Sequence, residues 1–422
     1  MERQVGIWGA VMMGLGSIVG TGVFVSIGVG FSVAGVLVLP AILVAAGVAT
    51  LNGLSSAQLA ANHPVSGGTY AYGYRWLTPS LGFSAGILFL VAKSASAATA
   101  ALGCSGYLLE LTGFESEVAR VVLPLLLVLA VTGLVAGGMK RSNGMNIGIV
   151  SLTLACLLAL IVTGILAGLH GNVFQQLKWS GDGAMVSSIH FLECCALMFV
   201  AFTGYGRIAT LGEEITMPEK NIPRAIILTL VISGLLYTLI GLVVVVAGVL
   251  SPEIGAGQWL SLKAVAESFN VSWVVAGIAV GAVTAMLGVL LNLVMGLSRV
   301  WFAMGREGDL PAFLGKVNSG SSSPTNSVVV TGVWIAALTL IGDVKMTWSL
   351  SAFTVLVYYA ITNLAATRLS AEERCFPKIL AWLGFAACLS LAFFVSPRML
   401  IAGTAILVAA NALRGLWVQR SR

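Results

Sequence analysis

The fold of this chain is decided by the stretch Gly16-Ser17-Ile18-Val19-Gly20-Thr21-Gly22, which interrupts an apolar segment running from Val5 to about Phe31. A second glycine-rich stretch, Thr203-Gly204-Tyr205-Gly206, interrupts another apolar segment about half the chain later. In lipid, each freed N–H or C=O costs several kcal/mol unless protein or a cavity satisfies it. Paired broken helices therefore point to the binding site of a secondary transporter. Either cluster alone also fits close helix packing.

Composition places most of the chain in lipid. Hydrophobic residues make up 58% of the 422, and only 9% are charged, against about 25% in soluble domains. Runs of about 20 apolar residues, long enough to cross a bilayer, recur along the sequence. We expect an all-α membrane protein with about twelve spans, over residues 5–30, 34–60, 80–108, 119–138, 144–169, 188–211, 223–250, 271–301, 326–343, 347–366, 378–396 and 399–417.

The positions of the basic residues predict how the chain is oriented in the membrane. With the N-terminus in the cytoplasm, fifteen of the 22 Lys and Arg residues fall in cytoplasmic loops and five fall outside. This asymmetry follows the positive-inside rule and predicts a multi-pass protein of the cytoplasmic membrane with both termini inside. The net charge of +6 is then a topology signal, and the dispersed basic residues do not favour nucleic-acid binding.

Several other classes of protein find no support in the sequence. The six cysteines and three histidines show no metal-ligand spacing, and no phosphate-binding loop or other cofactor motif is present. A membrane enzyme would need a catalytic constellation, which is not visible. A channel would need polar rings along its spans, and these are sparse. We expect a carrier without a cofactor.

The spacing of the two breaks predicts an inverted repeat within one transmembrane domain, residues 1–422. Residues 5–169 would form the first five-helix unit, residues 188–366 the second, and residues 378–417 two additional helices. The breaks would then meet near the bilayer midplane. A helix starting after Gly20 presents N–H groups suited to a carboxylate, and freed carbonyls at Ser17, Ile18 and Thr203 suit an ammonium group.

The ordered motifs resemble the amino acid–polyamine–organocation (APC) superfamily, which has a LeuT-like fold. Residues 16–24 resemble the first-helix signature of this family. Further similar stretches follow in the family's order: residues 64–70 after span 2, 202–205 in span 6, 213–224 after span 6 and 298–311 at the end of span 8. The resemblance covers spans 1 to 10 and implies an amino acid permease, with some similarity to L-type amino acid exchangers.

The resemblance also implies roles for individual residues. The family's carboxylate-binding loop corresponds to Gly20, Thr21 and Gly22. Its ammonium-binding carbonyls correspond to Ile18, Val200, Ala201 and Thr203, with Gly204 leaving room beside them. Phe202 takes the place of an aromatic residue that closes over substrate, or it packs in the core. The hydroxyls of Ser17 and Thr21 contact substrate or bond back to their own helix.

The sequence departs from the family pattern in its charges. Gly206 and Arg207 stand where many members carry an acidic residue, and span 5 lacks the lysine of many proton-coupled members. Span 3 instead carries Lys93. Lys93 and Arg207 must each face a cavity or a partner in lipid. For Lys93 we weigh proton coupling or substrate contact against an ion pair with Glu193. For Arg207 the alternative is a bond to the freed carbonyls.

Two positive charges near the pocket argue against cationic amino acids and polyamines. We predict neutral L-amino acids, with acidic amino acids held by Lys93 or Arg207 as the alternative. Span 8 lacks the hydroxyls of a sodium site, which leaves exchange, proton coupling or facilitated diffusion. An ion pair between Glu214 and Arg299 is a hypothesis for the inner gate. The sequence leaves open whether the carrier has an accessory subunit and in which direction it transports its substrate.

Overall fold

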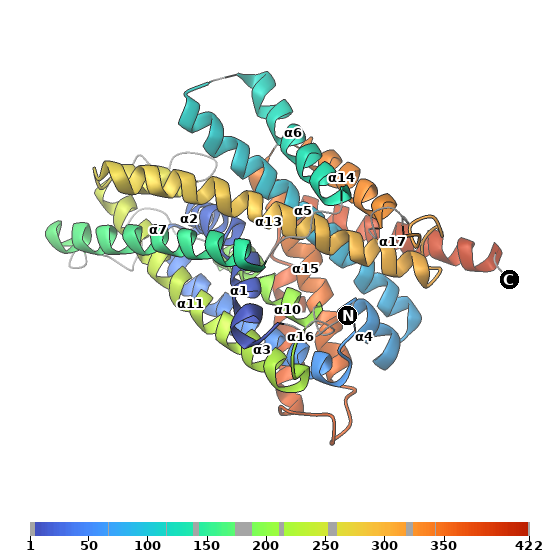
Figure 1. The fold of residues 1–422 in the computed structure, drawn as a ribbon. Coiled ribbons are helices and arrows are strands. Elements are labelled where there is room, and N and C mark those ends of the chain that lie inside the picture. Colours follow the sequence, from blue (N-terminus) through green and yellow to red (C-terminus); the bar gives the residue numbers. More distant parts are fainter. Residues whose placement is uncertain are drawn as a thin grey trace.

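Apolar helices form nearly all of the chain in the computed structural model (Figure 1), which describes residues 5–65, 67–114, 116–137, 143–173, 188–210, 215–251, 260–317, 324–341 and 343–420. Every predicted span overlaps a helix that the structure describes. The long helices are α1 (Ile7–Ile18), α3 (Val38–Asn62), α5 (Pro79–Thr112), α6 (Glu117–Ala136), α7 (Asn143–His170), α9 (Ser188–Phe202), α11 (Pro218–Leu250), α13 (Ser272–Arg306), α14 (Thr325–Thr339), α15 (Val344–Ala366), α16 (Lys378–Ala392) and α17 (Pro397–Arg420). The short ones are α2 (Ile27–Ala34), α4 (Thr69–Trp76), α10 (Gly206–Thr210) and α12 (Leu262–Glu267).

The described residues contain eight helical segments long and apolar enough to cross a membrane, or nine if α16 and α17, bent by 115°, form one span. This is a multi-pass membrane protein, although the count is lower than the twelve spans predicted. One segment, Ile7–Asn62, is 56 residues long. At about 1.5 Å per residue it exceeds one bilayer more than twofold. It turns at Gly35, whose φ of +52° suits glycine, between α2 and α3. The inverted repeat stays a prediction.

Both predicted interruptions are present. The α-helix α1 ends at Ile18, and a turn at Val19–Gly20 precedes the π-helix η1 (Gly22–Ser26) that leads into α2. In the second segment, the 3₁₀ turn η3 (Thr203–Tyr205) separates α9 from α10. The two interruptions pack together, because α1 contacts both η3 and α10 at the centre of the bundle (Figure 1).

Gly204 allows this close approach. A methyl group at Gly204 would lie 2.5 Å from Ile18 Cγ1 and 2.7 Å from the Ser17 carbonyl oxygen. Real side chains do not approach so closely, and the Ser17 backbone cannot move aside as a flexible side chain would. The absence of a Cβ at Gly204 therefore sets how closely the two breaks meet.

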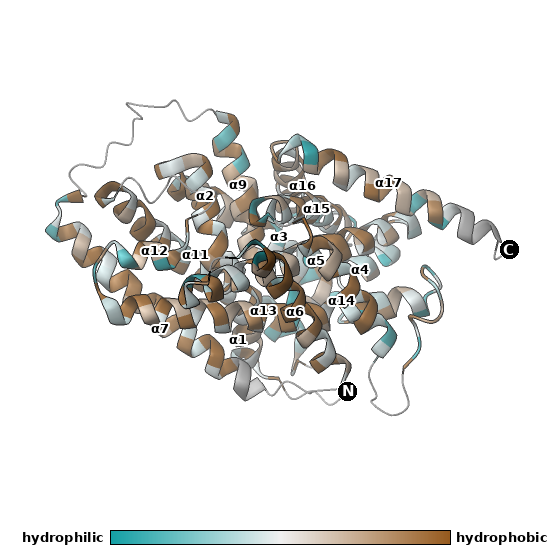
Figure 2. Cartoon of the chain, turned by 90° about the horizontal axis from the view of Figure 1, so that it is seen from above, coloured by the Kyte–Doolittle hydropathy of each residue, from teal (hydrophilic) through white to brown (hydrophobic). Residues whose placement is uncertain are grey.

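The helices divide into an inner and an outer group. Of the most apolar 18-residue stretch of each helix, 89% is buried in α15 and 83% in α5, against 28% in α6 and 33% in α7. Large apolar side chains on the outer group are exposed, including Leu129 of α6 (60%) and Leu158 of α7 (55%). Hydrophobic residues cover these outer helices in Figure 2. Such surfaces match lipid, whereas α5 and α15 build the protein interior.

A buried ion pair fixes α17 to one end of the bundle. Arg414 Nε donates to Asp309 Oδ1 over 2.9 Å, and the two side chains are only 15% and 6% exposed. The Asp309 carboxylate also accepts hydrogen bonds from the hydroxyls of Tyr70 (2.9 Å) and Tyr74, both on α4. Arg414 therefore joins the C-terminal helix to α4 and to the residues that follow α13.

We predict that Arg414→Ala lowers the free energy of unfolding by about 3 kcal/mol, because it leaves the Asp309 carboxylate buried without its counter-charge. The measurement is the thermal unfolding midpoint of the purified protein in detergent. Arg398→Ala, at an exposed position near the start of the same helix, is the control and should have little effect. Equal midpoints for the two variants would contradict the prediction.

Candidate functional site

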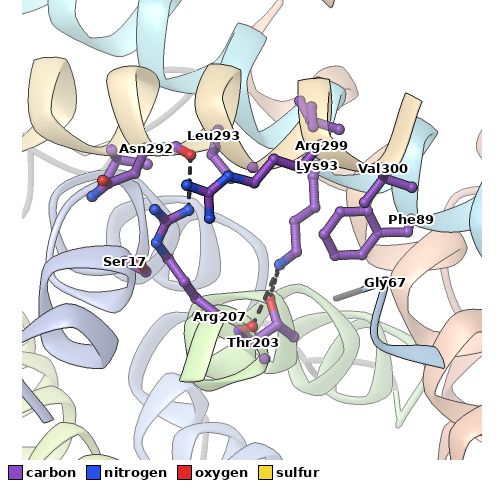
Figure 3. Close-up of a pocket in the computed structure, with 15 residues that line it drawn as sticks. Ser17, Gly67, Phe89, Lys93, Thr203, Arg207, Asn292, Leu293, Arg299 and Val300 are labelled. Carbon is purple, nitrogen blue, oxygen red and sulfur yellow. Dashed lines mark hydrogen bonds between the residues drawn. The ribbon is translucent and has the colours of Figure 1, made fainter. Parts of the chain in front are cut away.

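A pocket lies beside the second break, between η3, α10, α5 and α13 (Figure 3). The break itself contributes Thr203, Gly204 and Gly206, and Ser17 reaches the pocket from the end of α1. One wall is apolar. It is formed by Phe89 of α5 together with Val289, Leu293, Leu297 and Val300 of α13. The pocket is thus bounded by interrupted backbone and by faces of α5 and α13 that combine these apolar side chains with Lys93, Asn292 and Arg299.

Lys93 enters the pocket from the middle of α5. Its Nζ donates to Thr203 Oγ1 over 2.9 Å and to the Thr203 carbonyl oxygen over 3.5 Å. The Thr203 hydroxyl in turn donates to the Val200 carbonyl (2.7 Å), and the Tyr359 hydroxyl donates to the Thr203 carbonyl (3.3 Å). Lys93 is 9% exposed. Its charge is therefore held against neutral oxygen atoms of the break, not in the ion pair with Glu193 that we considered.

Tyr237 of α11 connects the two breaks directly. Its hydroxyl lies 2.8 Å from the Ile18 carbonyl oxygen and 3.1 Å from the Ala201 carbonyl oxygen, so its single O–H proton is shared between the two acceptors. These are two of the carbonyls that the family resemblance assigns to the substrate ammonium. The Phe202 ring packs edge-to-face on Tyr237, with centroids 5.0 Å apart. The Tyr237 hydroxyl is therefore hydrogen-bonded to a carbonyl at each of the two breaks.

Two arginines share another wall of the pocket. Arg207 of α10 donates from Nη1 to the carbonyl oxygen of Asn292 in α13, over 3.0 Å. This acceptor belongs to an intact helix, whereas the alternative that we weighed for Arg207 was a bond to the freed carbonyls of the break. A Cβ at Gly296 would meet only Arg207 Nη1, at 3.2 Å, so Gly296 leaves the opening through which the guanidinium reaches α13. Arg299 points toward Arg207 across this wall (Figure 3).

The charge of the pocket lining is positive. Lys93, Arg207 and Arg299 line it, and no aspartate or glutamate is among the described residues that do. Arg299, which we place at the inner gate, lines the pocket. Glu214, its predicted gate partner, lies outside the described residues, so that ion pair stays a prediction.

The structure divides the predicted site residues into two groups. Ser17, Thr203, Gly204, Lys93, Arg207 and Arg299 line the pocket. Ile18, Gly20, Thr21, Gly22, Val200, Ala201 and Phe202 are buried around the breaks but do not line it. The Ser17 hydroxyl donates back to the Met13 carbonyl over 3.0 Å, as in the alternative that we weighed. Roles for the second group stay predictions.

Sequence reasoning missed Tyr237, Tyr359 and the lining residues Phe89 and Asn292. A signal was available for the tyrosines, since a phenol within an apolar span needs a hydrogen-bond partner in a medium that offers none. No pattern indicated which carbonyls they would reach. Phe89 precedes Lys93 by one helical turn, and residues four apart lie on the same face of a helix. A pocket-facing Lys93 therefore implies a pocket-facing Phe89.

Comparison with known proteins identifies the family. A family model described as amino acid permease matches residues 9–416. The chain belongs to the amino acid permease family. An uncharacterised transporter of Mycobacterium tuberculosis is 36% identical over 425 residues, covering 100% of this chain and 93% of that protein.

Two relatives in Bacillus subtilis carry named substrates. The branched-chain amino acid permease BcaP is 28% identical, over 77% of this chain and 71% of that protein. The methylthioribose transporter is also 28% identical, over 84% of this chain and 80% of that protein. This permease is therefore a membrane transporter of amino acids or related small molecules, and not an enzyme.

We predict that Tyr237→Phe destabilises the permease by roughly 1–3 kcal/mol, because it removes the side-chain donor that the buried Ile18 and Ala201 carbonyls share, and leaves Ile18 only the Gly20 N–H. Tyr72→Phe is a matched control. Its hydroxyl is equally buried but has no partner among the described residues, so its removal should be neutral or stabilising. Thermal unfolding of both variants checks the prediction, and a Tyr237→Phe protein as stable as the control would contradict it.

Proposed function

We propose that this permease moves neutral L-amino acids across the cytoplasmic membrane by alternating access. In this proposal, the helices of residues 5–169 and 188–366 form two inverted five-helix units, and residues 378–417 add two helices. The substrate binds where the two breaks meet, and the units tilt about that site to open it to either side in turn. Both termini lie in the cytoplasm.

The observation that carries this proposal is the pairing of interrupted backbone with an apolar wall in one pocket. The break at Thr203–Gly206 replaces α-helical bonding with a 3₁₀ turn, and its residues Thr203, Gly204 and Gly206 border the pocket, so backbone carbonyl and N–H groups lie beside the ligand space. These groups match the ammonium and carboxylate that all amino acids share. The wall of Phe89, Val289, Leu293, Leu297 and Val300 matches an uncharged, apolar side chain.

The charge of the pocket lining and the name of one relative support the same substrate class. Lys93, Arg207 and Arg299 make the described lining positive, which disfavours cationic substrates. The Bacillus subtilis relative BcaP is named a branched-chain amino acid permease, and we extend that substrate class to this chain.

Acidic amino acids form the second candidate class. The Lys93 ammonium lies within the pocket and has no carboxylate partner among the described residues. A substrate carboxylate could pair with it. This candidate predicts a narrower substrate range than the neutral one, because the apolar wall would then face a charged side chain.

The first test is a thermal-shift screen of the purified permease against the proteinogenic amino acids and common polyamines. At about 100 times its dissociation constant, a ligand stabilises the folded state by about 2.7 kcal/mol. We expect neutral L-amino acids with apolar side chains to stabilise the protein. A response confined to glutamate or aspartate would replace the neutral proposal with the acidic one.

Gly204→Ala tests where the ligand binds. Its methyl group would push the breaks apart at Ile18 and Ser17, so we expect at least a tenfold loss of affinity. Gly148→Ala in α7 is the control, since nothing lies within 4 Å of the added methyl group. Equal affinity in the two variants would contradict a site at the breaks.

A further inference from the structure

Lys93 is a buried cation that is hydrogen-bonded to neutral atoms. Its Nζ donates to Thr203 Oγ1 over 2.9 Å and to the Thr203 carbonyl oxygen over 3.5 Å, and the residue is 9% exposed. None of the ion pairs among the described residues includes it. A charge within a membrane-spanning helix is costly unless a counter-ion or a polar cavity stabilises it. Lys93 therefore gives the pocket a positive charge that no described carboxylate neutralises.

The Lys93 ammonium has one N–H group left for a ligand. An ammonium carries three N–H donors, and two of them are directed at the two oxygen atoms of Thr203. Lys93 lines the pocket, and Figure 3 shows its side chain extending from α5 toward the second break. A carboxylate in the pocket can accept the third N–H in a charge-assisted hydrogen bond.

The carbonyls at the breaks already have donors within the protein. The family resemblance assigns four of them to a substrate ammonium: those of Ile18, Val200, Ala201 and Thr203. The Tyr237 hydroxyl is shared between Ile18 and Ala201, and the Thr203 hydroxyl donates to Val200. The Thr203 carbonyl accepts from Lys93 and from Tyr359. A ligand with its own ammonium must displace or share these donors, whereas a ligand without one leaves them in place.

The rest of the lining suits an anion with an apolar body. No aspartate or glutamate is among the described residues that line the pocket, so a ligand ammonium finds no counter-charge there. An ammonium close to Lys93 would meet a like charge, and such repulsion is strong in a low-dielectric site. Apolar side chains complete the lining beside Lys93, namely Phe89, Val289, Leu293, Leu297 and Val300. The pocket thus matches one carboxylate and an apolar side chain.

We propose that the Lys93 ammonium takes the place of a ligand's α-ammonium, and that the pocket therefore also takes monocarboxylates that lack an amino group. These are α-keto and α-hydroxy acids with an apolar side chain. Their carboxylate pairs with Lys93, and their side chain packs on the apolar faces of α5 and α13. The inference goes beyond the proposed function and shares with it only the apolar wall. Acidic amino acids fit this arrangement poorly, because they bring an ammonium to Lys93 and a charge to the apolar wall.

The test compares three ligands that carry the same branched side chain. The α-keto analogue of L-leucine keeps the carboxylate and lacks the ammonium, isopentylamine keeps the ammonium and lacks the carboxylate, and L-leucine has both. We expect the purified full-length permease to bind the keto acid at least as tightly as L-leucine. It should bind isopentylamine at least about tenfold more weakly, because the hydrogen bond to a charged group is lost. Isothermal titration calorimetry gives the dissociation constants, and uptake of labelled keto acid into proteoliposomes, compared with protein-free liposomes, shows whether it is cargo.

Two Lys93 variants and one control separate charge from structure. Lys93→Met removes the charge and keeps the length of the side chain. Lys93→Gln also removes the charge but keeps an N–H donor for Thr203, so it serves even where the methionine variant does not fold. In both, the affinity for the keto acid relative to L-leucine should fall at least about tenfold. Lys263→Met is the control, because Lys263 pairs with Glu110 and Glu267 and does not line the pocket, and it should leave this ratio unchanged.

The outcomes keep this inference apart from the proposed function. An unchanged ratio in Lys93→Gln, or a keto acid that the wild-type protein fails to bind or to take up, overturns the inference and leaves the proposed function standing. Loss of both ligands in Lys93→Gln also overturns it, because Lys93 would then be a structural anchor. Isopentylamine bound as tightly as the keto acid contradicts it as well. Wild-type protein that binds and takes up the keto acid but binds no neutral amino acid overturns the proposed function alone.

Discussion

Backbone carbonyls freed within the membrane interior are the constraint on which this structure depends. Lipid provides no donors, so each carbonyl at a helix break must find one in the protein. The Tyr237 hydroxyl serves Ile18 and Ala201, while Lys93 and Tyr359 serve Thr203. These donors come from α11, α5 and α15. Hydrogen bonding at the breaks therefore determines how these helices pack around α1 and α9.

Under the proposed function, the hydrogen bonds at the break carbonyls couple substrate binding to conformational change. In the structure, tyrosine and lysine side chains already occupy carbonyls that an amino acid's ammonium would use. Such a ligand can bind them only by replacing or sharing those donors, and each exchange alters a contact between a break and a neighbouring helix. Substrate binding then changes the packing that holds the two breaks together, which a carrier requires if its ligand is to shift the balance between states.

Close backbone packing and buried polar contacts both stabilise the bundle. Gly204 brings the two breaks into backbone contact, where a larger residue would separate them. At one end of the bundle, Asp309 and Arg414 join α17 to α4 through a buried ion pair. The outer helices α6 and α7 present apolar surface to lipid and contribute less to the interior. The pocket thus lies among the inner elements, and the outer helices α6 and α7 form the lipid-facing surface of the bundle.

The sequence by itself determined the membrane environment, the approximate position of each long helix that the structure describes, and the two interruptions. These features are local, because a bilayer requires long apolar runs and glycine clusters weaken the helix in which they lie. Only the tertiary structure decided that Tyr237 bridges both breaks, that Arg207 reaches Asn292, and that Arg299 lines the pocket. Tyr237 bonds a carbonyl 219 residues away in the chain. Such pairings depend on how distant helices pack, and no local pattern of residues encodes that packing.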